Sequence, residues 1–350
     1  MKRNTDLDFI RAILIMLMIL IHIVSFGNTY PHLKAGILSF MMPTFLIITG
    51  YLVNIEKTGK QMGKYLLCLA LPYVIMVTGF SVLSYFMPVR DGITELSVSQ
   101  ICEKIFVTSI GPYWFIQTMI ICGVLYYISF IGDTWEHFLR GKGQKKSYDT
   151  DTTDSTLKDL RRTMPYTSLF IFAILLLLVA KTPALSPSAA AYYFIGVVIR
   201  QSHVAWNKLF RPELMALPLW GVLLCHEEWY DWGTLAIGMS CWCCISTFMW
   251  LHTHLDHNKP GCPGNHPQGI SAKIDSTLLY IGRNTLPIYL FHPIFTMAAK
   301  FYHPLFAFDK SEIIFAIFTV LLAIAGSIAI ARIMEVTKIA YIFGKGKILR

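Results

Sequence analysis

The run IRAILIMLMILIHIVSF occupies residues 10–26 and is apolar except for Arg11, His22 and Ser25. A bilayer core needs ~20 predominantly apolar residues in helical form, and this run nearly supplies them. Similar runs recur along the chain, whose 350 residues are 55% hydrophobic and only 15% charged. Soluble domains usually carry ~25% charged residues. The sequence therefore predicts an all-α, polytopic membrane helix bundle and excludes a soluble enzyme.

The apolar runs predict about ten transmembrane helices. Their expected ranges are 9–26, 35–53, 65–87, 113–132, 167–183, 189–205, 213–229, 232–251, 277–299 and 312–333. An even number of spans places both termini on the same side of the membrane. The weakest of the ten is 213–229, because it becomes polar towards its end.

The positions of the basic residues predict which side that is. Most of the 30 lysines and arginines fall in one set of loops, the set that includes both termini. Cytoplasmic loops carry such an excess, so both termini are expected in the cytoplasm of a multi-pass protein of the cell (plasma or inner) membrane. The same rule explains the formal charge of +9. No basic stripe interleaved with aromatic residues occurs, and we expect no nucleic acid partner.

We expect a single membrane domain over residues 1–350, with two long cytoplasmic loops at 133–166 and 252–276. The first loop is polar and has the composition of a solvated linker. The second is rich in His, Gly and Pro, and contains the zinc-type ligands His252, His254, Asp256, His257, Cys262 and His266. Their spacing matches no standard zinc pattern, so we predict no metal, although the composition leaves the question open.

Ionisable residues inside predicted spans are costly and therefore mark candidate functional positions. Arg11 and His22 are separated by eleven residues, which brings them to one helix face about 16 Å apart along the axis. Arg11 is expected near the cytoplasmic surface, and His22 deep in the membrane. Asp8 precedes Arg11 by one turn and is placed to hold its side chain.

A cation at the entrance and an imidazole at depth suit a long anionic donor such as coenzyme A. Arginine binds phosphate through two parallel hydrogen bonds, and a neutral imidazole can take a proton from a hydroxyl. The alternative is that Arg11 extends to the membrane surface and His22 only pairs with a neighbouring helix. The spacing alone leaves both interpretations open.

The predicted span 277–299 adds a second polar face. It carries Arg283, followed by Thr285, Tyr289 and His292 at helical spacing. Hydrogen bonding between helices is the competing explanation for such residues. Two further candidates have structural alternatives of their own. Helix packing alone would account for Thr49, and an interfacial aromatic belt for Trp114.

These segments together resemble the acyltransferase-3 family of integral membrane O-acyltransferases. Asp8, Arg11 and His22 match the family's opening pattern of an Asp, a basic residue and, after ten intervening residues, a His. The other similar segments are PTFLIITGYL (43–52), YWFI (113–116), YYFIGVVI (192–199) and GRNTLPIYLFHP (282–293). Thr49 replaces the family's Ser and Ala12 its usual Gly. The chain resembles a stand-alone form that lacks the extracellular hydrolase-like domain of some members.

The resemblance implies transfer of an acyl group, most often acetyl, from a cytosolic acyl-CoA to a hydroxyl of a cell-surface glycan or its lipid-linked precursor. It implies His22 as the catalytic residue and Arg11 as the donor-binding residue. The remaining candidates for substrate or donor binding are Asp8, Thr49, Trp114, Arg283, Tyr289 and His292. The expected partners are acyl-CoA, the glycan or lipid-linked sugar and membrane lipid, with no tightly bound cofactor.

A transporter or flippase of a glycan precursor or small anionic solute is the alternative function. It would use the same ionisable faces for substrate passage. We find no inverted repeat with broken helices in the sequence, which is the usual indication of a transport site. Neither the acceptor nor the acyl group follows from the sequence.

Overall fold

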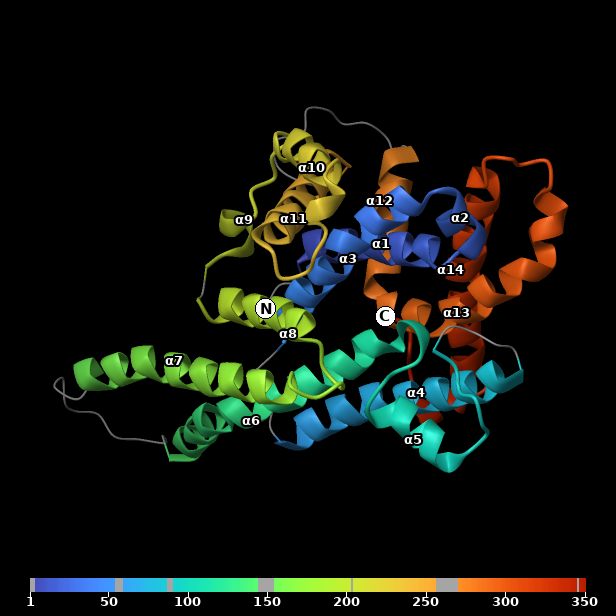
Figure 1. Ribbon diagram of the computed structural model, residues 1–350. Helices are drawn as coiled ribbons and strands as arrows, with labels where there is room; N and C mark the ends of the chain where they lie inside the picture. The colour runs from blue at the N-terminus through green and yellow to red at the C-terminus, as the bar shows by residue number, and fades with distance from the viewer. Residues whose placement is uncertain are drawn as a thin grey trace. The chain divides into compact units, whose positions relative to one another are not determined.

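The computed structural model describes most of the chain. The residues that it does not describe are 1–3, 54–58, 87–90, 144–153, 203, 256–269 and 345, and only the backbone is described for 131–143, 154–165 and 270–271. All regular elements in the described residues are helices, which confirms the predicted all-α bundle (Figure 1). Five of these helices are long and apolar enough to cross a membrane: Pro31–Leu52, Gly59–Phe86, Gly111–Phe130, Leu235–Leu255 and Ile313–Val336.

The chain divides into two compact units. The first unit comprises Met1–Ile48 and Val204–Arg350, and the second comprises Thr49–His203. Helix α3 (Pro31–Leu52) runs across the boundary between them. The side of the membrane that each terminus faces stays a prediction.

The first unit is built around α1 (Thr5–Ile21), which is apolar over most of its length and buried at ten of its positions. The Asn4 side chain starts this helix by accepting a hydrogen bond from the backbone N–H of Asp6 at 3.0 Å. Helix α1 packs against four others, and these five form the core of the unit. The other four are α11 (Leu235–Leu255), α12 (Ile270–Arg283), α13 (Thr285–Tyr302) and α14 (Ile313–Val336). The short elements of the unit are α2 (Val24–Thr29), α9 (Trp206–Leu209), α10 (Ala216–Leu224), η2 (Glu227–Trp229), η3 (His303–Phe306) and η4 (Ile339–Phe343).

The second unit is a smaller group of helices in which α6 packs against α4, α7 and α8. Its elements are α4 (Gly59–Phe86), α5 (Val98–Phe106), η1 (Gly111–Tyr113), α6 (Trp114–Gly143), α7 (Asp154–Val179) and α8 (Pro187–Gln201). A close approach brings α3 to α8 at Gly50, where a side-chain Cβ would lie 2.2 Å from the carbonyl oxygen of Tyr193. Only glycine fits at such a distance.

Two predicted spans are interrupted in the structure. The span 9–26 ends as α1 at Ile21 and restarts as α2 at Val24. The span 277–299 is divided into α12 and α13 at Asn284. Pro287 explains this second break, because it has no N–H to donate to the carbonyl of Arg283 one turn earlier.

Three further boundaries differ from the prediction. The span 213–229 contains one α-helix, α10, and the short element η2. Helix α10 is 9 residues long and reaches less than half of a ~30 Å hydrocarbon core. The polar residues His226, Glu227 and Glu228 follow it. The ends of the predicted loops at 133–166 and 252–276 are helical, because α6 and α11 continue into them and α7 and α12 begin within them. The middles of both loops lie outside the described residues.

Candidate functional site

The first part of the site is a cluster of charged side chains from α1 and α12. Asp8 is buried on α1, and its carboxylate lies 3.8 Å from Nη1 of Arg11 and 3.9 Å from Nε of Arg283. The second terminal nitrogen of Arg11 donates a hydrogen bond to the hydroxyl of Thr285. We call Asp8, Arg11, Arg283 and Thr285 the arginine cluster. One carboxylate thus faces two guanidinium groups, which leaves a net positive site.

The exposure of these side chains shows how the cluster is oriented. The side chain of Asp8 is only 6% exposed, whereas those of Arg11 and Arg283 are 25% and 39% exposed. The carboxylate therefore lies behind the two cations and leaves part of each accessible. This arrangement suits an anionic ligand, because arginine side chains bind phosphate or carboxylate oxygens through parallel hydrogen bonds.

The backbone contact between α1 and α12 depends on Gly282. A Cβ atom at this position would lie 1.8 Å from the carbonyl oxygen of Asp8, which is far inside van der Waals contact. Glycine therefore allows the two helices to approach closely enough for Arg283 to reach Asp8.

The break between α12 and α13 is held open by polar contacts of Asn284. Its amide nitrogen donates to the carbonyl of Tyr280 at 2.9 Å, and its amide oxygen accepts from the N–H of Arg350 at 2.8 Å. Asn284 is fully buried, so these bonds satisfy a side chain that would otherwise be costly to bury. The break places Arg283 and Thr285 on either side of it, both against α1.

His22 lies at the other end of α1, where the helix stops. Its ring nitrogen Nδ1 is 2.6 Å from the carbonyl oxygen of Met18. A carbonyl only accepts, so Nδ1 carries the hydrogen and, in the neutral ring, Nε2 carries the lone pair. The backbone N–H of His22 bonds to Ile19 instead of Met18. The His22 ring, and not the backbone N–H of His22, therefore bonds to the Met18 carbonyl. This one bond both ends α1 and orients the imidazole.

His292 on α13 lies beside His22. The two ring centroids are 5.4 Å apart, and the rings meet edge to face at 74°. Nδ1 of His292 is 2.8 Å from the carbonyl oxygen of Tyr289, so its lone pair is also on Nε2. His292 is fully buried, and within the described residues its Nε2 has no hydrogen-bond partner. We call His22 and His292 the histidine pair.

The structure thus brings six predicted residues onto α1 and the α12–α13 segment: Asp8, Arg11, His22, Arg283, Tyr289 and His292. Tyr289 joins through its ring, which is 5.9 Å from that of His292. The other two, Thr49 and Trp114, belong to the second unit. The Trp114 ring packs edge-on against Phe115 at the start of α6, at 6.2 Å. Their part in the site stays a prediction.

A buried histidine that the sequence placed in a loop belongs to α11 instead. His252 is fully buried, stacks on Phe9 at 4.8 Å, and lies between two carboxylates. Its Nδ1 is 2.6 Å from Asp6, and its Nε2 is 3.4 Å from Asp275. Its register with Ile245 and Met249 on the buried face of α11 was the available signal.

The predicted loop at 252–276 contains residue types that can bind a metal ion. Among the described residues, no group of three or more His, Cys, Asp or Glu side chains is placed to hold a metal ion. Four of the ligands considered from the sequence, Asp256, His257, Cys262 and His266, lie outside the described residues.

One protein-family model covers almost the whole chain. A model described as an acyltransferase domain, that of the acyltransferase-3 family, matches residues 4–332. The chain belongs to the acyltransferase-3 family. It is therefore a membrane acyltransferase, and the match includes both the arginine cluster and the histidine pair. Searches of curated proteins and of solved structures returned no match.

Proposed function

We propose that this acyltransferase moves an acetyl group from cytosolic acetyl-CoA to a hydroxyl of a cell-surface glycan or its lipid-linked precursor, at the cell membrane. The orientation of His22 supports this proposal most directly. Its Nδ1–H is committed to the carbonyl of Met18, which leaves Nε2 as the basic atom. A general base needs a lone pair that is fixed in direction and free to meet a hydroxyl.

In the proposed reaction, Nε2 of His22 takes the proton of the acceptor hydroxyl as that oxygen attacks the thioester carbonyl. A C–O bond forms and the C–S bond breaks, and the leaving thiolate takes the proton back from the imidazolium. The bond from Nδ1–H to Met18 becomes charge-assisted when the ring is protonated, and such bonds are about twice as strong as neutral ones. The Met18 carbonyl therefore stabilises the protonated ring.

The arginine cluster is the proposed site for the phosphates of the donor. Arg11 lies on the same helix as His22, about 16 Å away along the axis. The pantetheine arm of coenzyme A separates its phosphates from its thioester, so one donor molecule can extend along this helix. Asp8 holds Arg11 and Arg283 from behind, and Thr285 fixes one end of the Arg11 guanidinium.

The histidine assignment can be tested with membranes that contain the wild type or the variant His22→Gln, incubated with labelled acetyl-CoA. His254→Gln is a matched control, because His254 makes the same type of ring bond, to the carbonyl of Trp250 at 2.9 Å, but is exposed at the end of α11. We expect label on a lipid-linked or polymeric glycan, reduced about 10²–10⁴-fold by His22→Gln. The control should transfer label as the wild type does.

Equal labelling by wild type and His22→Gln at equal expression would remove His22 from the chemistry. Label that appears with succinyl-CoA but not with acetyl-CoA would keep acyl transfer and correct the acyl group.

A further inference from the structure

Lys34 is a basic residue beside α2, the short helix that follows His22, and the reaction described above does not use it. It lies in the first turn of α3 and is half-buried. Its side chain passes over α2 at Gly27, where a Cβ atom would lie 2.8 Å from Cδ and 3.0 Å from Nζ. A side chain at position 27 would displace the flexible end of Lys34 from this path. The position of the ammonium group beside α2 therefore depends on Gly27.

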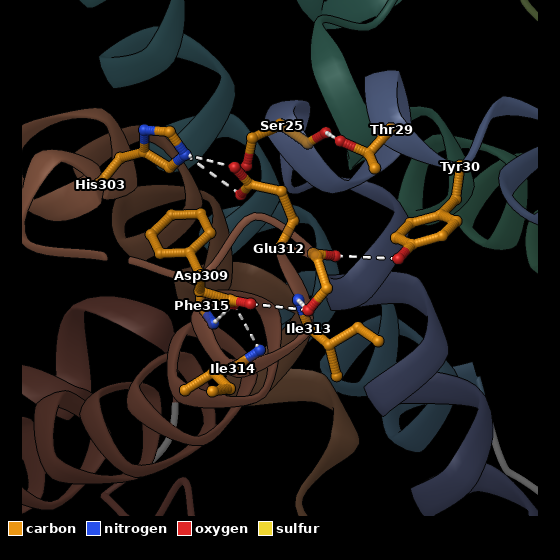
Figure 2. A network of polar contacts seen from close by, with 10 residues as sticks. Ser25, Thr29, Tyr30, His303, Asp309, Glu312, Ile313, Ile314 and Phe315 are labelled. Atoms are coloured by element: carbon orange, nitrogen blue, oxygen red, sulfur yellow. Dashed lines mark hydrogen bonds and ion pairs between the residues drawn. The ribbon is translucent and has the colours of Figure 1, made fainter. Parts of the chain in front are cut away.

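The ammonium group of Lys34 has no carboxylate partner within the part of the chain that the structure describes. Three carboxylates of the same unit are engaged elsewhere. Glu227 pairs with His32, Glu312 lies 2.9 Å from His303, and Asp309 accepts from Ser311 at 2.6 Å. Figure 2 shows the last two of these contacts, together with the bond from Tyr30 at the end of α2 to the carbonyl of Ser311. A partly buried cation without a counter-ion is costly unless an anion binds it.

The position of Lys34 relative to His22 indicates which anion that is. Gly27, which the Lys34 side chain passes, follows His22 by five residues and lies in α2, on the far side of the break that follows α1. The arginine cluster, in contrast, lies towards the start of α1. An anion at Lys34 is therefore separated from the proposed phosphate site by the length of that helix.

We infer that Lys34 binds an acidic group of the acyl acceptor, a phosphate or a carboxylate, and so places the acceptor hydroxyl at Nε2 of His22. This inference rests on the proposed function. It identifies the acceptor as an acidic glycan or a phosphate-linked sugar rather than a neutral one. Lys34 is thus a specificity-determining residue.

The test uses the purified full-length protein in nanodiscs of zwitterionic phosphatidylcholine, with labelled acetyl-CoA. The acceptors are three synthetic glycolipids: neutral glucosyl-diacylglycerol, glucuronosyl-diacylglycerol with a carboxylate, and polyprenyl-phosphate glucose with a phosphate. The variants are Lys34→Met, Lys34→Arg and Gly27→Ala, which displaces the lysine without removing its charge. Lys300→Met, an exposed lysine at the end of α13, is the control. Transfer kinetics and the thermal stabilisation by each glycolipid are both measured.

We expect the wild type to show at least a tenfold higher kcat/KM with one acidic acceptor than with the neutral one, chiefly through KM. Lys34→Met should reduce this preference to about one and abolish the extra stabilisation by the acidic glycolipid. Lys34→Arg should keep most of the preference, Gly27→Ala should weaken it, and Lys300→Met should leave it unchanged. Whichever acidic glycolipid is preferred distinguishes phosphate from carboxylate.

Three results would overturn the inference while the proposed function stands. The first is transfer without any preference for acidic acceptors, and the second is equal losses with acidic and neutral acceptors in Lys34→Met. The third is equal stabilisation when phosphatidylglycerol is added to the nanodiscs in place of the acidic glycolipid, which would make Lys34 a lipid contact. Stabilisation that depends on Lys34 without transfer to any acceptor would keep the anion site and reject the proposed function. Neither stabilisation nor transfer would reject both.

Discussion

The arginine cluster and the histidine pair lie on the same chain segments but are built in opposite ways. In the arginine cluster, charged side chains from α1 and α12 hold one another, and two guanidinium groups face one buried carboxylate. In the histidine pair, each ring is bonded to a carbonyl of its own helix. The edge-to-face contact of the two rings joins the end of α1 to α13.

The difference indicates that the two groups meet different demands. A site for a charged ligand needs fixed charges of the opposite sign, and compensation by Asp8 makes two adjacent arginines tolerable. A site for proton transfer needs a ring with one committed nitrogen and one basic nitrogen. A strong ion pair at His22 would hold its proton and remove that property. Breaking each group separately should therefore have distinct effects.

The largest effect on stability is expected for Gly282→Ala, which disrupts the backbone contact between α1 and α12 beneath the arginine cluster. The added methyl group would overlap the carbonyl of Asp8 and push α12 away from α1. We expect a loss of about 3 kcal/mol, at the upper end for overpacked positions, measured by chemical unfolding in detergent.

The matched control for this change is Gly238→Ala in α11, where a Cβ meets no atom within 4 Å. It should leave stability unchanged or raise it by up to about 1 kcal/mol, because alanine favours helix over glycine. Equal stability of the two variants would contradict the close contact of α1 with α12.

The next effect is expected for Asp8→Ala, which leaves Arg11 and Arg283 facing each other without their shared carboxylate. We expect a loss of about 1–2 kcal/mol in unfolding free energy, less than for a fully buried pair because both arginines are partly exposed. Asp8→Asn keeps the size of the side chain and serves as the control for packing. If Asp8→Ala proved as stable as the wild type, the carboxylate would not be the partner that compensates the two arginines.

The sequence predicted which residues form the arginine cluster and the histidine pair, but not the backbone and side-chain contacts that fix their positions. Helical periodicity placed Arg11 and His22 on one face, and ionisable residues in apolar runs identified Arg283 and His292. The breaks at His22 and Asn284 were missed, since hydropathy averages over a window and does not register a side chain that takes a backbone carbonyl. Pro287 was a visible signal for the second break.

Contacts between distant segments could not be predicted from the sequence. Asp6 and Asp275 lie far from His252 along the chain, and no spacing rule joins them. Similarly, the closeness of Gly282 to Asp8 and of Gly27 to Lys34 depends on how the helices pack. A glycine in the sequence does not by itself indicate such a contact, because glycines also occur in turns and at helix ends.

A moderate effect is expected for His292→Gln, which alters the histidine pair without removing His22. The edge of the His292 ring supports the His22 ring, so its loss should reduce kcat about tenfold, or roughly 1.4 kcal/mol in the barrier. KM for acetyl-CoA should stay unchanged, because the arginine cluster is intact. A change in KM alone, measured by steady-state transfer, would place His292 in donor binding instead.

The smallest effect concerns Asp309, which lies outside both groups in the connection between α13 and α14 (Figure 2). Hydrogen bonds from the Ser311 hydroxyl and from the N–H groups of Phe315 and Ile314 lower the pKa of this carboxyl. The folded state therefore favours the carboxylate. This stabilisation is present above the usual pKa of about 4 and is lost as the pH falls through the lowered value.

Asp309→Asn should accordingly lower the stability at pH 7 more than at acidic pH, as measured by thermal unfolding over a pH series. Asp231→Asn, in an exposed position of the same unit, is the control. A pH-independent difference between wild type and Asp309→Asn would show that the charge of Asp309 does not contribute.

We propose that the start of α1, at Arg11, binds the donor and that the end of α1, at His22, carries out the proton transfer. The most direct test measures kcat and KM for acetyl-CoA in Arg11→Gln and His22→Gln. Arg11→Gln should raise KM at least tenfold with little change in kcat. His22→Gln should lower kcat about 10²–10⁴-fold with little change in KM. If both variants changed the same parameter, the division of roles along α1 would be contradicted.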